Sequence, residues 1–231
     1  MFEKIKVTDK IKLACGDCLE VLKTLPDNSI DSLVTDPPAG ISFMGKEWDS
    51  DKGGRDQWIK WFAENMSETF RVLKPGGHGL VWAIPRTSHW TTTALEDAGF
   101  EIRDIIMHIF GTGFPKSLNI GKAIDSKLGL EREVIGVKKH PTSTDRTGNK
   151  SPYQAENSHL DGNIELTSPN SDLAKKYDGY GTALKPAAEH WILIRKPISE
   201  KTIAENVMKW GTGGINIDDC RIGTDGGETN C

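Results

Sequence analysis

Long apolar runs are scarce in this sequence of 231 residues. An uncharged apolar run such as Trp191-Ile192-Leu193-Ile194 is far shorter than the roughly 20 residues that cross a bilayer. The amino-terminal residues MFEKIKVTDK are charged and contain no apolar signal-peptide region. These absences predict a protein without a membrane partner, and its default location is cytoplasmic.

Cysteine is also scarce, with 4 residues in the whole chain. So few cysteines in a chain of this length do not form a disulfide framework, which fits a reducing compartment. Cys15 and Cys18 form a CxxC pair, but Cys220 and Cys231 lie too far apart to supply the second close pair of a zinc site. We therefore expect no metal centre.

An overall excess of positive charge is missing too, because the formal net charge is −4. This balance argues against a protein that is uniformly basic for nucleic-acid binding. The distribution is uneven, however, and residues 111–155 carry 8 Lys and Arg against 4 Asp and Glu. This segment fits either a solvated basic loop or a patch that contacts phosphates.

Up to residue 110 the sequence alternates short apolar runs with amphipathic helical periods, as an α/β domain does. Lys74-Pro75-Gly76-Gly77 is interpreted as the carboxyl-terminal cap of one helix. The short connections predict a parallel, doubly wound sheet with its ligand beyond the carboxyl ends of the strands. The predicted strands are 11–17, 29–36, 78–84 and 101–110, and the predicted helices are 18–26, 57–77 and 91–99.

The composition changes at residue 111. Residues 111–184 are rich in Ser, Thr, Asn, Gly and Pro and poor in large aliphatic side chains, so we expect a loop-rich, polar insertion. Residues 185–231 resume an ordered pattern, which begins with a strand candidate in KPAAEHWILIRKP. The chain therefore divides into three regions, 1–110, 111–184 and 185–231.

The first region contains an unusual strand end, SLVTDPPAG, at residues 32–40. Proline fixes its own φ and disfavours helical geometry in the residue before it, so Asp36 and Pro37 are held extended. The Asp36 carboxylate and the free proline carbonyls then form a stiff rim of hydrogen-bond acceptors. Such a rim suits a substrate that presents an NH₂ group, and the alternative is a strand-terminating turn without chemistry.

Five segments, in this order, resemble the N4-cytosine and N6-adenine DNA methyltransferases, whose shared motif is Asp, Asn or Ser followed by Pro-Pro and an aromatic residue. They are GDCLEVLKTLPDNSIDSLVTDPPAGISFMGKEWD, RVLKPGGHGLVWAIPRTSHW, FGTGFPKSLNIGKAID, KPAAEHWILIRKP and AENVMKWGTGGINIDDCRI. The likeness is to phage and prophage members of permuted order, in which the Asp-Pro-Pro motif comes first. It covers most of the chain outside the insertion and implies the cytosol of a bacterium or of a phage-infected host.

The resemblance implies a Rossmann-like sheet and methyl transfer from S-adenosylmethionine to the amino group of a base flipped out of double-stranded DNA. Residues 1–110 would be the catalytic half, and 111–184 the target-recognition region of a restriction-modification type of enzyme. An Asp at the start of the motif favours adenine N6 over cytosine N4. The implied catalytic positions are Asp36, Pro37, Pro38 and Ala39, and the implied cofactor contacts are Gly16, Asp17 and Asp36.

Ala39 departs from the family pattern, because the family usually has an aromatic residue there to stack on the flipped base. Such stacking contributes roughly 1–3 kcal/mol, so we expect Phe43 or Trp48 to supply the missing ring. The basic region is expected to contact the DNA phosphates. The candidates for those contacts are Lys116, Ser117, Lys138, Lys139, Arg146 and Lys150.

The Phe-x-Gly-x-Gly cofactor loop of permuted members is not found before Cys231. We therefore expect an incomplete cofactor site and weak binding of S-adenosylmethionine by the chain alone, completed by a missing carboxyl-terminal segment or a homodimer partner. Two other functions stay open. They are a non-catalytic DNA-binding remnant and an RNA or protein amide methyltransferase. The recognition sequence does not follow from the residues.

Overall fold

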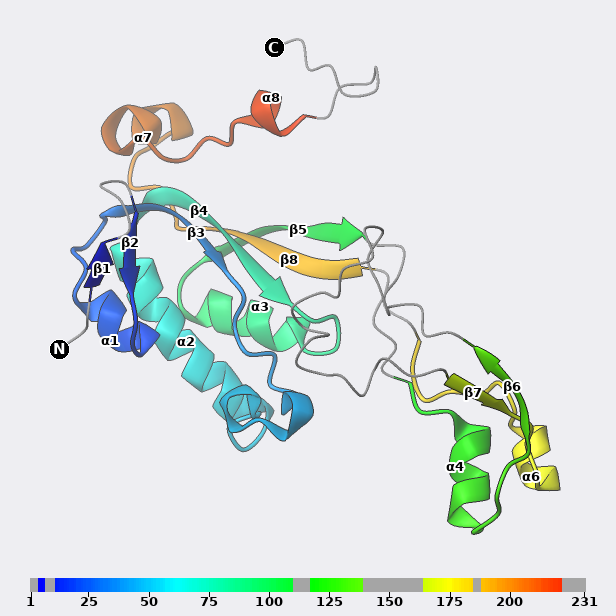
Figure 1. Ribbon diagram of the computed structural model, residues 1–231. Coiled ribbons are helices and arrows are strands. Elements are labelled where there is room, and N and C mark those ends of the chain that lie inside the picture. The colour runs from blue at the N-terminus through cyan, green and yellow to red at the C-terminus, as the bar shows by residue number, and fades with distance from the viewer. Residues whose placement is uncertain (1–3, 7–10, 110–116, 139–163, 185–187, 222–231) are drawn as a thin grey trace. The chain divides into compact units, whose positions relative to one another are not determined.

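The computed structural model describes residues 4–6, 11–109, 117–138, 164–184 and 188–221 (Figure 1). The chain forms two compact units. The first unit combines residues 1–111 with 188–231, and the second comprises residues 112–187. Within the described residues, no helix is long and apolar enough to cross a membrane.

The first unit consists of short strands and helices that alternate along the chain. In its amino-terminal part these are β1 (Lys4–Lys6), β2 (Lys12–Ala14), α1 (Cys18–Lys23), β3 (Ile30–Thr35), η1 (Phe43–Gly45), η2 (Glu47–Asp49), α2 (Arg55–Val72), β4 (Leu73–Ala83), α3 (Ser88–Asp97) and β5 (Glu101–Ile109). After the second unit follow β8 (Ala188–Arg195), α7 (Ile203–Trp210) and α8 (Ile217–Cys220).

The main sheet has four strands in the order β3-β4-β8-β5. β3 pairs parallel with β4, whereas β8 pairs antiparallel with both β4 and β5, so β3, β4 and β5 all run in the same direction. The α/β class is confirmed, but the expectation of a fully parallel sheet is wrong. The chain leaves the sheet at the carboxyl end of β5 and re-enters it at the same end, where Ala188 of β8 pairs with Ile109. A strand that starts at this end must run antiparallel to β5.

The strand predicted at 11–17 is shorter than expected and does not join the main sheet. Its residues Lys12–Ala14 pair antiparallel with β1 in a separate two-stranded sheet. About half of the Ile11 and Leu13 side-chain surface is exposed, so this segment buries no apolar face against the main sheet. A strand without such a face lacks the packing that fixes a place in a larger sheet.

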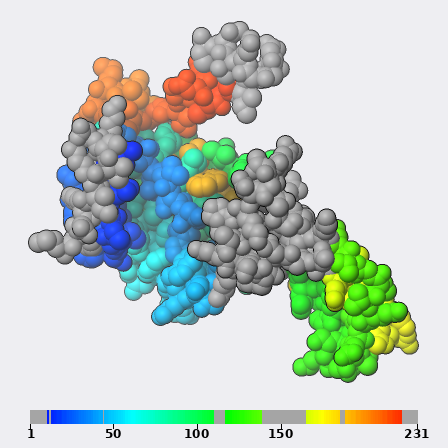
Figure 2. Space-filling model, in the orientation of Figure 1, coloured from blue at the N-terminus to red at the C-terminus, as the bar shows by residue number. Residues whose placement is uncertain are grey.

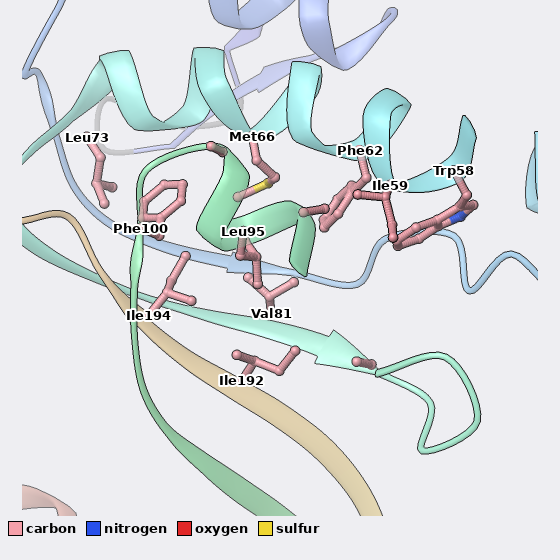
Figure 3. Packing of buried hydrophobic residues seen from close by; sticks show 13 residues of the cluster. Trp58, Ile59, Phe62, Met66, Leu73, Val81, Leu95, Phe100, Ile192 and Ile194 are labelled. Atoms are coloured by element: carbon pink, nitrogen blue, oxygen red, sulfur yellow. The ribbon is translucent and has the colours of Figure 1, made fainter. Parts of the chain in front are cut away.

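The core of the first unit lies between the main sheet and two helices, α2 and α3, which cover one of its faces (Figure 1). The buried side chains Trp58, Phe62 and Met66 recur along α2 at helical spacing. Figure 3 shows them directed at the sheet and at α3. Their partners in this cluster include Leu73 and Val81 of β4, Leu95 of α3, Phe100, and Ile192 and Ile194 of β8.

Lys74-Pro75-Gly76-Gly77 belongs to β4 and does not cap α2, contrary to the expectation. The carbonyls at the end of the helix are satisfied from elsewhere in the chain, and the N–H groups of Asn28 and Ser29 bond to those of Arg71 and Val72. The buried ammonium group of Lys196 donates hydrogen bonds to the carbonyl oxygens of Phe70 and Leu73, at 2.7 Å each. This lysine takes the place of a capping glycine, so the chain passes directly from helix to strand.

A buried asparagine fastens α7 to the start of β4. The Nδ2 group of Asn206 donates hydrogen bonds to the carbonyl oxygens of Pro75 and Thr212, at 2.8 Å each. Gly76, with a φ of +80°, lies directly against this amide. The close approach of α7 therefore depends on the absence of a side chain at residue 76.

The second unit contains ordered elements that its polar composition does not predict. They are α4 (Ile120–Lys127), β6 (Val134–Lys138), β7 (Ile164–Thr167) and α6 (Asp172–Lys176). β6 and β7 pair antiparallel, and α4 packs on α6. The green and yellow atoms of this unit adjoin in Figure 2. The expectation of a loop-rich insertion is therefore wrong for this part of the chain.

The carboxylate of Asp125 joins these elements from a buried position. Its Oδ1 accepts hydrogen bonds from the N–H and the hydroxyl of Ser171, at 3.0 and 2.7 Å. Its Oδ2 accepts from the N–H of Asn170 at 3.0 Å and from the guanidinium of Arg132 at 3.2 Å. Burial alone would raise the pKa of Asp125, but these hydrogen bonds and the charge of Arg132 outweigh it and lower the pKa. In the described part of the second unit, this polar hub takes the place of an apolar core.

Candidate functional site

The Asp-Pro-Pro motif lies at the edge where the carboxyl ends of β3, β4 and β5 meet. Asp36 directly follows the last residue of β3. A cleft of about 520 Å³ opens there, bounded by the motif, the start of α1 and one side of α2. Four residues singled out from the sequence line this cleft together: Gly16, Asp36, Pro37 and Pro38.

The carboxyl group of Asp36 is exposed beside the cleft, yet its surroundings disfavour the charged form. Partial burial raises the pKa of Asp36, and the negative charge of Glu189, at the start of β8, raises it further. The Glu189 carboxylate lies 3.7 Å from Nδ1 of His108, at the end of β5. No described residue donates a hydrogen bond to Asp36, so its oxygens can accept N–H groups from a substrate.

Asp17 begins α1 as its amino-terminal cap. Its Oδ1 accepts hydrogen bonds from the N–H groups of Leu19 and Glu20, at 3.0 and 3.2 Å. Both bonds use Oδ1, so capping does not occupy Oδ2. Gly16 lines the cleft next to it, which leaves the cofactor contact predicted for this pair compatible with its place in the fold.

The aromatic side chains that line the cleft come from α2. Phe43 in η1 and Trp48 in η2 are 41% and 59% exposed, and neither is among the lining residues, whereas Trp61 and Phe62 are. We did not single out these two from the sequence, because helical spacing assigns them to the core. The available signal is the density of rings, with Trp58, Trp61 and Phe62 in five consecutive residues.

The residues after the motif are held by contacts from two other elements. The hydroxyl of Thr87, after β4, donates a hydrogen bond to the carbonyl oxygen of Ala39 at 2.9 Å. Gly40 has a φ of +70° and lies so close to Trp58 that a Cβ atom would come within 2.8 Å of the indole Nε1. Glycine is required there both by the backbone conformation and by the close approach of the ring.

Only part of the predicted DNA-contacting set falls on described residues. Ser117 and Lys138 belong to the second unit, and both are exposed. The Ser117 hydroxyl accepts a hydrogen bond from the N–H of Ala183 at 3.2 Å, and Lys138 is the last residue of β6. The remaining candidates, which lie outside the described residues, are Lys116, Lys139, Arg146 and Lys150.

No model of a protein family matches this sequence. Among curated proteins, it is similar to the type II methyltransferase M.BamHI of Bacillus amyloliquefaciens, with 38% identity over 85 residues, or 37% of this chain and 19% of that protein. The type II methyltransferase M.BglII of Bacillus subtilis is 34% identical over 73 residues, or 32% of this chain and 19% of that protein. The chain thus spans about a fifth of the length of these relatives.

Solved structures show a weaker likeness. TTHA0409 of Thermus thermophilus, named as a DNA modification methylase, has 16% identity and a TM-score of 0.40 over 81% of this chain and 54% of its own. The cytosine-N4-specific PvuII DNA methyltransferase has 18% identity and a TM-score of 0.39 over 82% of this chain and 51% of its own. Both TM-scores lie below 0.5, so we base the assignment on sequence similarity and on the motif. By these, the chain is similar to type II methyltransferases over about a third of its length, and its Asp-Pro-Pro motif fits the resemblance to the N4-cytosine and N6-adenine DNA methyltransferases.

Proposed function

We propose that this chain acts in DNA methylation, in the transfer of a methyl group from S-adenosylmethionine to the exocyclic amino group of adenine or cytosine. The observation that carries the proposal is the shared cleft, in which Asp36, Pro37 and Pro38 stand beside Gly16 at the carboxyl edge of the sheet. The sequence similarity to type II methyltransferases supports it. Because the motif begins with Asp36, we propose adenine N6 as the target.

The cleft fits a nucleoside that carries a cationic sulfur. Its walls include apolar side chains from two helices, among them Leu22 of α1 and Met66 of α2. Asp36 presents a carboxylate without a hydrogen-bond donor among the described residues, and this charge attracts a sulfonium cation. Bound there, S-adenosylmethionine would supply an electrophilic methyl group.

The acceptor rim would raise the low nucleophilicity of the amino group that is to be methylated. An exocyclic amino group is a poor nucleophile because its lone pair is delocalised into the ring of the base. The Asp36 carboxylate would accept one N–H and the Pro37 carbonyl the other, which favours a pyramidal nitrogen with its lone pair directed at the methyl group. The bond to a carboxylate is charge-assisted and therefore stronger than a neutral one.

Asp36 also accounts for the proton that the reaction releases. Transfer forms a nitrogen–carbon bond and breaks the carbon–sulfur bond, whose electron pair stays on sulfur. The nitrogen must then lose one proton. Asp36 already accepts a hydrogen bond from that N–H, its raised pKa makes it a better proton acceptor, and its exposure lets the proton pass to water.

The target base must leave the duplex to reach this cleft, so we propose base flipping by a protein of the bacterial or phage-infected cytoplasm. The second unit is our candidate for phosphate contacts and target recognition. Its described residues Ser117 and Lys138 are exposed, as such contacts require. Phe43 and Trp48 remain our candidates for stacking on the base, as exposed rings in the segment that follows the motif.

Methyl transfer by the full-length gene product tests the proposal. Tritiated S-adenosylmethionine and unmethylated genomic DNA are expected to give labelled N6-methyladenine, which nucleoside chromatography separates from N4-methylcytosine. Removing one preorganised group of this kind costs about 10²–10³-fold in kcat, so Asp36→Ala should lower the rate by about that factor. Asp56→Ala, which removes an exposed carboxylate of α2 outside the cleft, serves as the matched control.

Two results would contradict the proposal. Salt-dependent retention of DNA without any labelling of it would point to a non-catalytic DNA-binding protein. Labelling of RNA or of protein amides, with DNA left unlabelled, would replace DNA as the substrate. Labelled N4-methylcytosine would overturn the adenine assignment alone.

A further inference from the structure

A second carboxylate close to the motif is buried and has no part in the mechanism above. Asp49, at the end of η2, is 1% exposed. Its Oδ1 accepts a hydrogen bond from the N–H of Gly40 at 3.0 Å, and its Oδ2 accepts one from the N–H of Phe43 at 2.8 Å. Its main-chain carbonyl oxygen accepts a third from the N–H of Ser42 at 2.7 Å. Three of the four residues after Ala39 are therefore tied to Asp49.

These N–H groups are what stabilises the buried charge. Among the described residues no ion pair involves Asp49, and a buried carboxylate without a cation persists only when hydrogen bonds compensate for the water it has lost. One donor reaches each oxygen, so the carboxylate spans the segment from Gly40 to Phe43 as a two-pronged clamp. Both bonds are charge-assisted and are therefore stronger than bonds between neutral groups.

The clamped segment has a backbone that needs outside support. Gly40 and Ser42 have φ values of +70° and +52°, and for a residue with a side chain, such as Ser42, this region is sparsely populated. Such conformations persist where surrounding contacts over-determine them. Here the contacts come from three elements, since Thr87 holds the Ala39 carbonyl and Trp58 packs against Gly40.

We propose that Asp49 is a positioning residue for the acceptor rim. Its carboxylate fixes residues 40–43, and because the chain runs without a break from Pro37 through Ala39 to Gly40, it also fixes the direction of the Asp36 and Pro37 acceptors. Asp49 lies outside the residues that line the cleft, so it acts through the segment and not on the base. This role rests on the proposed function.

Asp49→Asn is the informative variant, with Glu47→Gln as its matched control. The asparagine keeps the shape of the side chain but removes the charge, and its amide nitrogen cannot accept a hydrogen bond from a backbone N–H. Glu47→Gln removes the same charge from an exposed side chain of the same short segment. Hydrogen exchange of the backbone amides and the kinetics of methyl transfer are measured for both variants.

In Asp49→Asn, the amides of residues 40, 42 and 43 are expected to exchange at least about tenfold faster, while those of α2 and β4 keep their protection. A merely structural role would instead raise exchange throughout the first unit. The kcat should fall about 100-fold with the KM for DNA little changed, because a displacement of about 1 Å at a reacting group costs that much. Glu47→Gln should match the wild type in both measurements.

The results separate this inference from the proposed function. A kcat unchanged in Asp49→Asn, or amides of the segment that stay protected, would overturn the positioning role. A wild-type protein that transfers no methyl group would overturn the proposed function, and the exchange data would still decide whether Asp49 holds the segment. If Asp49→Asn does not fold, Thr87→Val releases the same segment at Ala39, and the same local loosening with a loss of kcat is expected.

Discussion

The raised pKa of Asp36 disfavours its charged form in the folded chain, and in the proposed mechanism it helps this carboxylate to accept a proton. Its partial burial beside Glu189 raises its pKa, which means that the folded chain disfavours the ionised carboxylate. A carboxylate in such a setting is poised to accept hydrogen bonds and then a proton. The Pro-Pro sequence pointed to Asp36, but nothing in it pointed to Glu189, which reaches the same strand edge from a distant part of the chain.

Glu189→Gln should shift the acid side of the pH profile of methyl transfer. Asp36 must be ionised to accept the amino N–H, so activity falls as the pH drops through the pKa of Asp36. Because that pKa is raised, the loss begins at a higher pH than for an ordinary aspartate, and removing the neighbouring charge should move it to lower pH. Rates measured against pH for the wild type, Glu189→Gln and the exposed control Glu96→Gln check this. An acid side that does not move, or that moves to higher pH, would contradict it.

The joints between elements depend on side chains that are distant in the sequence. Lys196 bonds to carbonyls at the end of α2, and Asn206 docks α7 on the start of β4. β4 begins immediately after the helix, and its pairing with β3, in which Thr35 lies opposite Val81, brings its carboxyl end beside the motif. The local sequence pattern predicted that Gly76 caps α2. In the structure this glycine instead makes room for Asn206 of α7, a contact between distant residues that a local pattern does not reveal.

Gly76→Ala should destabilise the first unit more than Gly211→Ala does. Both glycines have a left-handed φ, +80° and +75°, so each substitution carries a backbone cost of about 1–2 kcal/mol. A Cβ at residue 76 would also lie 2.5 Å from Nδ2 of Asn206, whereas a Cβ at residue 211 would meet no atom within 4 Å. Overpacking adds about 1–3 kcal/mol to the loss of unfolding free energy. Urea denaturation of both variants measures the difference, and equal losses would rule out the clash.

At the scale of the whole molecule, the two units are built on different principles. The first buries an apolar cluster of helix and strand side chains, whereas the second is organised around the carboxylate of Asp125. A hub of this kind depends on the ionised state of one group. The second unit should therefore be sensitive to single polar substitutions and to acid in a way that the first is not.

Asp125→Ala should loosen the second unit and leave the first intact. The substitution leaves Arg132, Asn170 and Ser171 without their shared acceptor, so amides of α4 and α6 should exchange at least about tenfold faster. The pKa of Asp125 is lowered, so its contribution is complete above the ordinary aspartate pKa and is lost as the pH falls through the lowered value. Hydrogen exchange against pH checks both points, with the exposed Asp172→Ala as the control. Unchanged exchange in α4 would contradict the hub.

Part of this protein follows from the sequence alone. The α/β class, the alternation of strands and α-helices from β2 to β5, and the acceptor motif at the end of β3 all follow from short-range patterns of apolar, proline and glycine residues. They could be predicted because each depends on neighbours a few residues away. Gly16 and the Asp-Pro-Pro motif also share a cleft, as expected for residues that follow adjacent predicted elements.

Only the tertiary structure decided the rest. Four features join residues that no local sequence pattern connects. They are the antiparallel return of β8, the capping of α2 by Lys196, the aromatic wall of the cleft formed by α2, and the hydrogen bonds from residues 40–43 to Asp49. The physical reason is that burial and hydrogen-bond satisfaction are settled by whichever groups the fold brings together. The sequence determined which hydrogen-bond acceptors end β3, and the fold determined what holds them in place.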